Sequence, residues 1–129
     1  MLEILRKELT LAKDAEATTT SIQEITPTAT KLAFGYDNDK GEFYVKTSKT
    51  STNTALIAEI NLSSTSTVFT VQTINPPPPE PKPKKYVKVT LIHENPSVTL
   101  EATINLLNSF QLTNPSTTTT SGNTLIVTK

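Results

Sequence analysis

The densest group of oxygen-bearing side chains lies in one short polar segment, where Asp37, Asn38, Asp39 and Glu42 fall close together. Carboxylate and amide oxygens at such short spacing are ligands that suit Ca²⁺. The segment departs from the EF-hand pattern, because Gly41 falls at the fifth position rather than the sixth and the later glutamate is missing. We therefore interpret the segment as a plain hairpin turn, with calcium binding as the alternative.

Other reactive side chains lack the partners that catalysis needs. His93, followed by Glu94, is the only histidine, the chain has no cysteine, and no serine lies in a Gly-x-Ser-x-Gly motif. General acid–base catalysis and metal binding both require several such groups to converge. Glycine occurs only at positions 35, 41 and 122, which excludes glycine-rich phosphate loops. The sequence therefore predicts a protein that is not an enzyme, with no catalytic residue, no metal ligand and no cofactor.

A proline-rich segment, residues 76–85, offers a different kind of site. It begins with Pro76, Pro77, Pro78 and Pro79, and its Pro-x-x-Pro spacings followed by lysines meet the minimal requirement for docking to an SH3-type groove. Prolines fix φ and lack an amide donor, so we expect polyproline II, which at ~3.1 Å per residue gives a strut of roughly 30 Å. A spacer is the favoured interpretation, and a peptide ligand is the alternative.

Threonine is the strongest indicator of fold. It accounts for 25 of the 129 residues and alternates with apolar side chains in segments 28–34, 65–71 and 98–106. A period of two residues is typical of a half-buried strand, in which β-branched threonine suits the exposed side. The sequence predicts an all-β fold, an antiparallel β-sandwich or jelly roll, with a short N-terminal helix and a polyproline II connection.

The clearest local prediction is a hairpin that pairs residues 31–36 with 42–47 across a turn at 37–41. Polar residues punctuate the rest of the chain into short segments, as in a sandwich. Further strands are expected at 22–26, 55–62, 67–74, 86–92, 98–107, 109–113 and 123–128.

Two segments leave alternatives open. Residues 96–108 fit a strand by strict alternation, which we favour, and a helix by the spacing of their leucines and isoleucine. The proline-rich segment either crosses the end of one sandwich, which we favour, or separates two lobes, 1–75 and 86–129. Residues 114–123 are expected to form an exposed polar loop.

The N-terminus predicts an amphipathic helix from Leu2 to about Ala17, with Leu2, Leu5 and Leu9 on one stripe. The helix either packs on its own domain or forms an arm that docks on a neighbouring subunit. Accordingly, residues 1–21 are expected to be a helical arm and polar linker, and residues 22–129 a β-sandwich domain interrupted by the connection at 76–85.

Composition argues against some classes of binding partner. The 12 basic and 12 acidic side chains cancel, which argues against nucleic acid, and no apolar run is long enough for membrane insertion. The charged first residues do not resemble a signal peptide, so synthesis in the cytoplasm is expected. Few aromatic residues imply a thin core, which favours burial of further surface in a homo-oligomer.

These features predict a non-enzymatic structural protein, foremost a minor virion subunit of a capsid, decoration, spike-base or fibre type. It would oligomerise through edge strands and the N-terminal arm, with other structural proteins of the same assembly, and end in a virion or an extracellular assembly. The alternative is a recognition module that binds carbohydrate or a protein partner through its loops. For that role Tyr36 and Tyr44, which flank the hairpin, are the expected surface pair.

Overall fold

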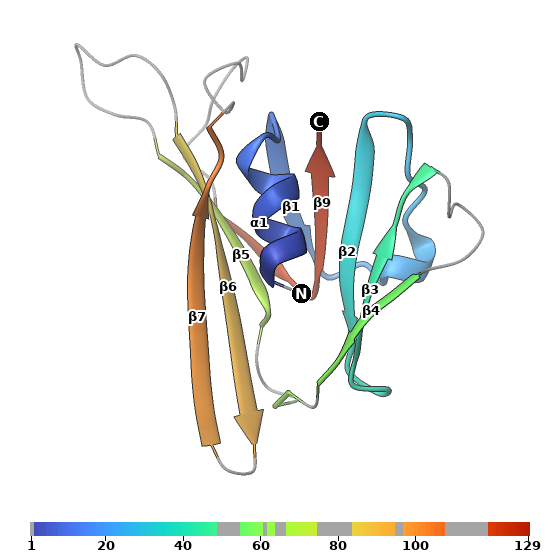
Figure 1. Cartoon of the computed structure of the whole chain (residues 1–129), viewed down its shortest axis with the longest axis vertical. Coiled ribbons are helices and arrows are strands. Elements are labelled where there is room, and N and C mark those ends of the chain that lie inside the picture. The colour runs from blue at the N-terminus through green and yellow to red at the C-terminus, as the bar shows by residue number, and fades with distance from the viewer. Residues whose placement is uncertain are drawn as a thin grey trace.

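The computed structural model describes residues 2–48, 55–60, 62–63, 67–74, 84–94, 97–107 and 119–129. Its strands form two antiparallel sheets that face each other as in a β-sandwich, with one short helix between them (Figure 1). The all-β prediction is confirmed at this level. The jelly-roll alternative stays a prediction, and residues 76–83 lie outside the described part of the chain.

The first sheet contains five strands in the order β1-β9-β2-β3-β4. The predicted hairpin is confirmed, since β2 pairs with β3 from Ala33 opposite Lys46 to Asp37 opposite Glu42. The bounds are Asp14–Thr18 for β1, Lys31–Asp37 for β2, Glu42–Lys46 for β3, Ala55–Glu59 for β4 and Thr124–Thr128 for β9.

The second sheet contains four strands in the order β7-β6-β5-β8. Strands from both sides of the proline-rich segment share each sheet, because β9 pairs with β2 and β5 pairs with β6. The two-lobe alternative is therefore wrong. The bounds are Phe69–Ile74 for β5, Lys84–Glu94 for β6, Ser97–Asn105 for β7 and Thr119–Gly122 for β8.

The core lies between the sheets and rests on alternating apolar side chains. Phe43 of β3 is fully buried, and its ring contacts Tyr36 at a centroid distance of 4.7 Å and Phe69 at 6.5 Å. These three rings tie the two sheets together across the sandwich, and aliphatic side chains fill the rest. The fully buried aliphatic residues include Val68, just before β5, and Val87, Val89, Leu125 and Val127 in the sheets.

The helix α1 (Leu2–Thr10) packs within its own chain, with Leu5 and Leu9 fully buried in the core. Of the two interpretations of the N-terminus, the structure shows packing on the chain itself. The prediction of a helix to Ala17 is wrong in its second half, where β1 pairs with β9. The structural reason is that Ala15 and Ala17 alternate with polar residues and are buried by this pairing. Within the described ranges, no helix is long and apolar enough to span a membrane.

Three further segments differ from or refine the sequence prediction. Residues 22–26 contain a 3₁₀ helix, Ile22–Glu24, in place of a strand, and the Ser21 side chain caps it by accepting a hydrogen bond from the Gln23 amide at 3.3 Å. Residues 96–108 do contain a strand, β7, as the alternation predicted. Part of the expected loop at 114–123 is strand β8, whereas the strand expected at 109–113 lies outside the described residues.

A single residue, Asn123, separates β8 in one sheet from β9 in the other. Its side-chain oxygen accepts a hydrogen bond from the Val68 amide at 3.0 Å, and its backbone oxygen accepts one from the Tyr36 amide at 2.8 Å. The preceding Gly122 lies so close to β1 that an added Cβ would stand 2.0 Å from the Thr18 carbonyl oxygen. Glycine is therefore required where the chain crosses between sheets.

Candidate interaction surface

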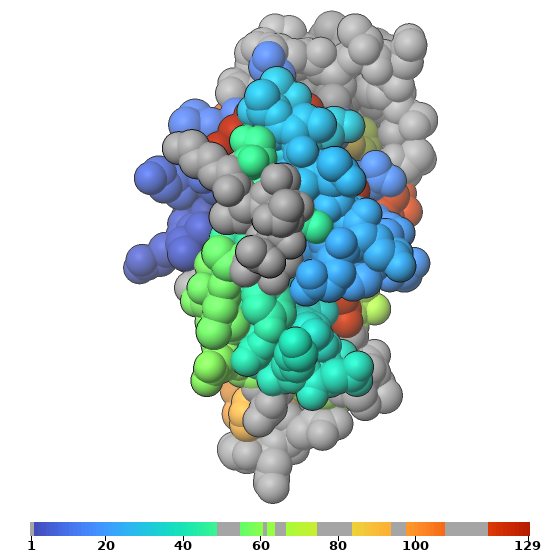
Figure 2. Space-filling view, turned by 90° about the vertical axis from the view of Figure 1, so that its right-hand side faces the viewer, coloured from blue at the N-terminus to red at the C-terminus, as the bar shows by residue number. Residues whose placement is uncertain are grey.

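A polar hollow of about 520 Å³ lies beside the β2–β3 turn. The turn and β4 are neighbours on the face shown in Figure 2. The residues that line the hollow come from the turn, from the end of β4 and from β6: Lys40, Gly41, Glu42, Glu59, Ile60 and His93. The hollow is lined by the only histidine, His93, and by two glutamates, Glu42 and Glu59. It is therefore the first place to look for acid–base groups.

Tyr44, whose partner Glu42 lines the hollow, is committed to an internal hydrogen bond. Tyr44 is 9% exposed, and its hydroxyl donates to the Glu42 carboxylate. This hydrogen bond raises the pKa of Tyr44 to about 12, and burial of the ring adds to the effect. The negative charges of Glu42, Asp37 and Glu59 act in the same direction. The phenol therefore stays protonated at neutral pH and cannot serve as a base.

The hydroxyl of Tyr36 is also used in internal hydrogen bonds. Its hydroxyl donates to the Ile60 carbonyl at 3.0 Å and accepts a hydrogen bond from the Leu62 amide at 2.9 Å. With 7% of its surface exposed, its side chain fastens the segment after β4 to β2. The expectation that Tyr36 and Tyr44 form an exposed surface pair is therefore wrong. Tyr36 belongs to the main core cluster, where its ring contacts Phe43. Tyr44 is buried in a second cluster, where it packs with Ile22.

Within the carboxylate cluster at the turn, the Asp37 side chain accepts hydrogen bonds from the backbone. The Asp37 side chain accepts hydrogen bonds from the amides of Asp39 at 3.0 Å and Lys40 at 3.3 Å. Gly41 has a φ of 64°, a conformation that favours glycine, and its amide donates to the Asp37 carbonyl at 2.9 Å. Among the described residues no three His, Cys, Asp or Glu side chains converge as metal ligands. These contacts are those of a hairpin turn.

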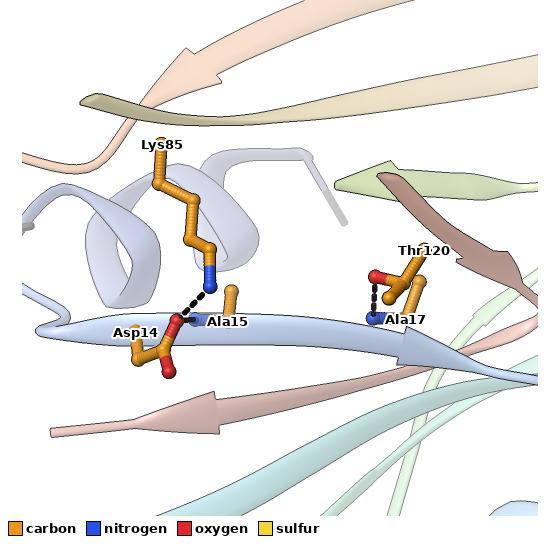
Figure 3. Close-up of polar contacts among 5 residues, drawn as sticks. All are labelled: Asp14, Ala15, Ala17, Lys85 and Thr120. Carbon is orange, nitrogen blue, oxygen red and sulfur yellow. Dashed lines mark hydrogen bonds and ion pairs between the residues drawn. The ribbon is translucent and has the colours of Figure 1, made fainter. Parts of the chain in front are cut away.

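An ion pair and a side-chain hydrogen bond close the opposite side of the sandwich (Figure 3). Lys85 of β6 reaches Asp14 of β1, with side-chain exposures of 13% and 40%. On the same strand, the Ala17 amide donates to the Thr120 hydroxyl of β8 at 3.0 Å. The edges of β1 and β8 are thereby tied to each other. A partner strand has less access to these edges than to the other side of the molecule.

The β6–β7 hairpin presents the apolar side chains with the largest exposed fractions in the second sheet. It reaches past the β2–β3 turn at one end of the molecule (Figure 1). Val98 and Leu100 are 55% and 51% exposed, although they share a face with Ile104, which is 2% exposed. The inner face of β7 is thus part of the core at one end of the strand and uncovered at the other.

The hydrogen-bond pattern between β7 and β6 shows which backbone groups of β7 face away from β6. Leu106 donates to the Lys85 carbonyl at 3.0 Å, and hydrogen-bonded pairs alternate along an antiparallel ladder. Leu100 therefore bonds to β6, whereas Thr99, Glu101 and Thr103 direct their backbone groups away from it. β7 is the outermost strand in the sheet order, and no described strand pairs with this edge.

This edge differs from the other three edges of the two sheets. Proteins protect edges by keeping them short, by bulges or by lysine and proline. β1 and β4 have five residues each, β8 has four, and the register of β4 on β3 shifts at Phe43 and Tyr44. β7 has nine residues, an unbroken register and neither lysine nor proline, and its one charged residue, Glu101, is paired with Lys88 of β6 in the same sheet. It is the long unprotected edge among the described strands.

The residues singled out from the sequence are therefore not brought together. Leu5 and Leu9 lie in the core, Leu2 packs partly against it, and the two tyrosines are buried in separate clusters. The four prolines Pro76 to Pro79 lie outside the described residues. Sequence analysis missed Val98 and Leu100, because their alternation is the same as that of the buried Ile104 and only the strand order shows that β7 is an edge.

Comparisons with protein-family models, with curated proteins and with solved structures gave no match to this chain.

Proposed function

We propose that this chain is a non-enzymatic structural subunit that assembles with its neighbours through edge-strand pairing. The observation that supports this role is the β7 edge, which is long and unprotected and carries the exposed side chains of Val98 and Leu100. Unpaired backbone groups on an edge form hydrogen bonds with an added strand, and neighbouring apolar side chains add affinity and register. We place the subunit in a virion, as a minor capsid, decoration, spike-base or fibre component.

The internal use of the reactive groups supports a non-enzymatic role. The hydroxyls of Tyr36 and Tyr44 and the carboxylate of Asp37 all serve the fold. Catalysis needs an acid, a base or a nucleophile free to meet a substrate. Assembly needs only a rigid sandwich with an accessible edge. The virion assignment rests on the threonine-rich β-composition together with this edge.

Of the two contacts expected from the sequence, edge strands and the N-terminal arm, we retain the edge strands. The N-terminal helix was expected to reach a neighbour, but Leu5 and Leu9 are fully buried in their own chain. Releasing them would expose two leucines, each worth about 2 kcal/mol of burial. The β7 edge requires no such rearrangement. It is therefore the one of the two expected contacts that we propose.

A carbohydrate-binding role gains no such support. Aromatic platforms are the usual means of holding a sugar ring, and the two tyrosines suggested for this purpose are buried. Among the described residues, the polar hollow beside the turn is one of several hollows open to a small ligand. Binding on a glycan array by the full chain would favour recognition over assembly.

Native mass spectrometry of the full chain, at total concentrations from about 1 to 100 µM, tests the proposal. We expect a fraction of oligomer that rises with concentration, since a single strand edge is a small contact. Analytical ultracentrifugation over the same range provides an independent measurement. A monomer at every concentration in both experiments would contradict self-assembly.

A further inference from the structure

We infer that the β7 edge binds a second copy of this chain, antiparallel and around a two-fold axis, with Leu100 opposite Leu100 of the second copy. This inference rests on the proposed assembly function and specifies its contact. Two-fold pairing extends the second sheet across both molecules and keeps the apolar faces on the same side. Val98 and Leu100 of each copy then form one cluster of four side chains.

The hydrogen-bonding directions allow this register. Thr99 and Glu101 direct their backbone groups to the free edge, so Thr99 of one copy faces Glu101 of the other as a hydrogen-bonded pair. Leu100 then lies in the intervening non-hydrogen-bonded pair, in which side chains approach most closely. The alternation of β7 therefore presents apolar residues to apolar residues and polar residues to polar residues.

Charge disfavours the next register along the strand. A shift by one residue places Glu101 opposite Glu101 of the second copy, and like charges directly opposite each other destabilise a sheet. In the Leu100 register Glu101 faces a threonine instead. It also keeps its own partner, Lys88, which lies 3.4 Å away on β6. The pairing thus forms without opposing two unscreened carboxylates.

The helix limits pairing further along the same direction. The Leu107 amide donates to the Thr10 carbonyl at 3.2 Å, so the end of α1 occupies the edge beyond β7. A register centred on Ala102 would carry the second copy over Leu107 and displace this contact. A register centred on Thr99 shortens the overlap from 97–103 to 97–101. The Leu100 register is the longest that satisfies both charge and helix.

The size of the contact predicts a weak dimer. Seven paired residues at ~3.4 Å each extend about 24 Å, and a sheet about 10 Å thick gives a footprint of about 240 Å² on each copy. The two copies together bury about 480 Å², which is below the ~1,000 Å² of total surface that stable interfaces bury. We therefore expect a dissociation constant in the micromolar range.

Two matched lysine variants test the location. Leu100→Lys places two ammonium groups against each other at the axis, and we expect the dimer to weaken by about 100-fold or more in sedimentation equilibrium. Leu56→Lys is the control, because Leu56 is 49% exposed on the β4 edge of the other sheet, against 51% for Leu100. Circular dichroism checks that both remain folded. Equal dimerisation of both variants would overturn the inference while leaving self-assembly intact.

Single cysteine variants test the register, because the chain has no cysteine of its own. In a non-hydrogen-bonded pair the Cα atoms lie about 4.5 Å apart, within the range of a disulfide. We expect Leu100→Cys to form a covalent dimer under mild oxidation and Val98→Cys, equally exposed, to form little, since it faces Ala102. Cross-linking by Ala102→Cys or Thr99→Cys in preference to Leu100→Cys would show another register and overturn the inference. A wild-type chain that stays monomeric throughout would instead refute the proposed function itself.

Discussion

Replacing Leu9 with alanine tests whether the N-terminal helix belongs to the core. Leu9 is fully buried in the main core cluster. Leucine-to-alanine changes at such sites cost 2 to 5 kcal/mol through lost burial and the cavity left behind, so we expect a loss of about 3 kcal/mol. The whole domain is expected to hold about 6 to 19 kcal/mol of unfolding free energy, so the loss is a substantial share of it.

Ile4→Ala provides the matched control, because Ile4 lies on the same helix and is 42% exposed. We expect it to cost about 1 kcal/mol or less, since little packing is lost and alanine favours a helix. Urea unfolding followed by circular dichroism measures both changes, and an unchanged slope shows that the compactness of the states is preserved. If Leu9→Ala costs no more than Ile4→Ala, the helix is not packed as the structure has it.

Three further perturbations follow from single contacts. Because the folded pKa of Tyr44 is raised from 10.0 to about 12, the stability that this group contributes is complete below pH 10 and is lost as pH rises towards 12. Glu42→Gln should lower this pKa in an absorbance titration of the folded protein. An unchanged titration would contradict the hydrogen bond. Gly122→Ala should destabilise the fold by at least about 2 kcal/mol in urea unfolding, because the new Cβ meets the backbone of β1; a change below about 0.5 kcal/mol would show that this close approach is absent. Asp14→Asn should lower the free energy of unfolding by about 1 kcal/mol, since Lys85 is mostly buried while Asp14 is partly solvated. If the difference in stability between wild type and variant is the same at low and at high salt, the ion pair is not the cause.

The sequence predicted the elements that local chemistry decides. The β2–β3 hairpin follows from the turn at Asp37 and Gly41, where side-chain acceptors and a positive φ determine the conformation. β7 follows from strict alternation, which outweighed the helical spacing of Leu100, Ile104 and Leu107. In both cases the decisive signal lies within ten residues of chain, and no distant partner is needed to read it.

The elements that were missed depend on distant partners. β1 is a short alanine and acid segment that becomes a strand because β9 lies beside it. β8 lies in a run of threonines that resembles a loop, and it is a strand because it pairs with β5. The tyrosines were expected on the surface because one face of a hairpin usually meets water. Here Ile22 covers that second face, and Tyr44 is buried with it.

The candidate surface depends on the same distinction. Alternation places Leu100 and Ile104 on one face of β7, and the pattern gives both the same expectation of burial. The position of the other sheet makes them different, because only the far end of the hairpin extends beyond it (Figure 1). An apolar residue at that end contributes little to the core of a single chain. Its replacement by lysine should therefore leave folding largely unchanged and alter association, which is why Leu100 is the residue at which fold and assembly can be separated by experiment.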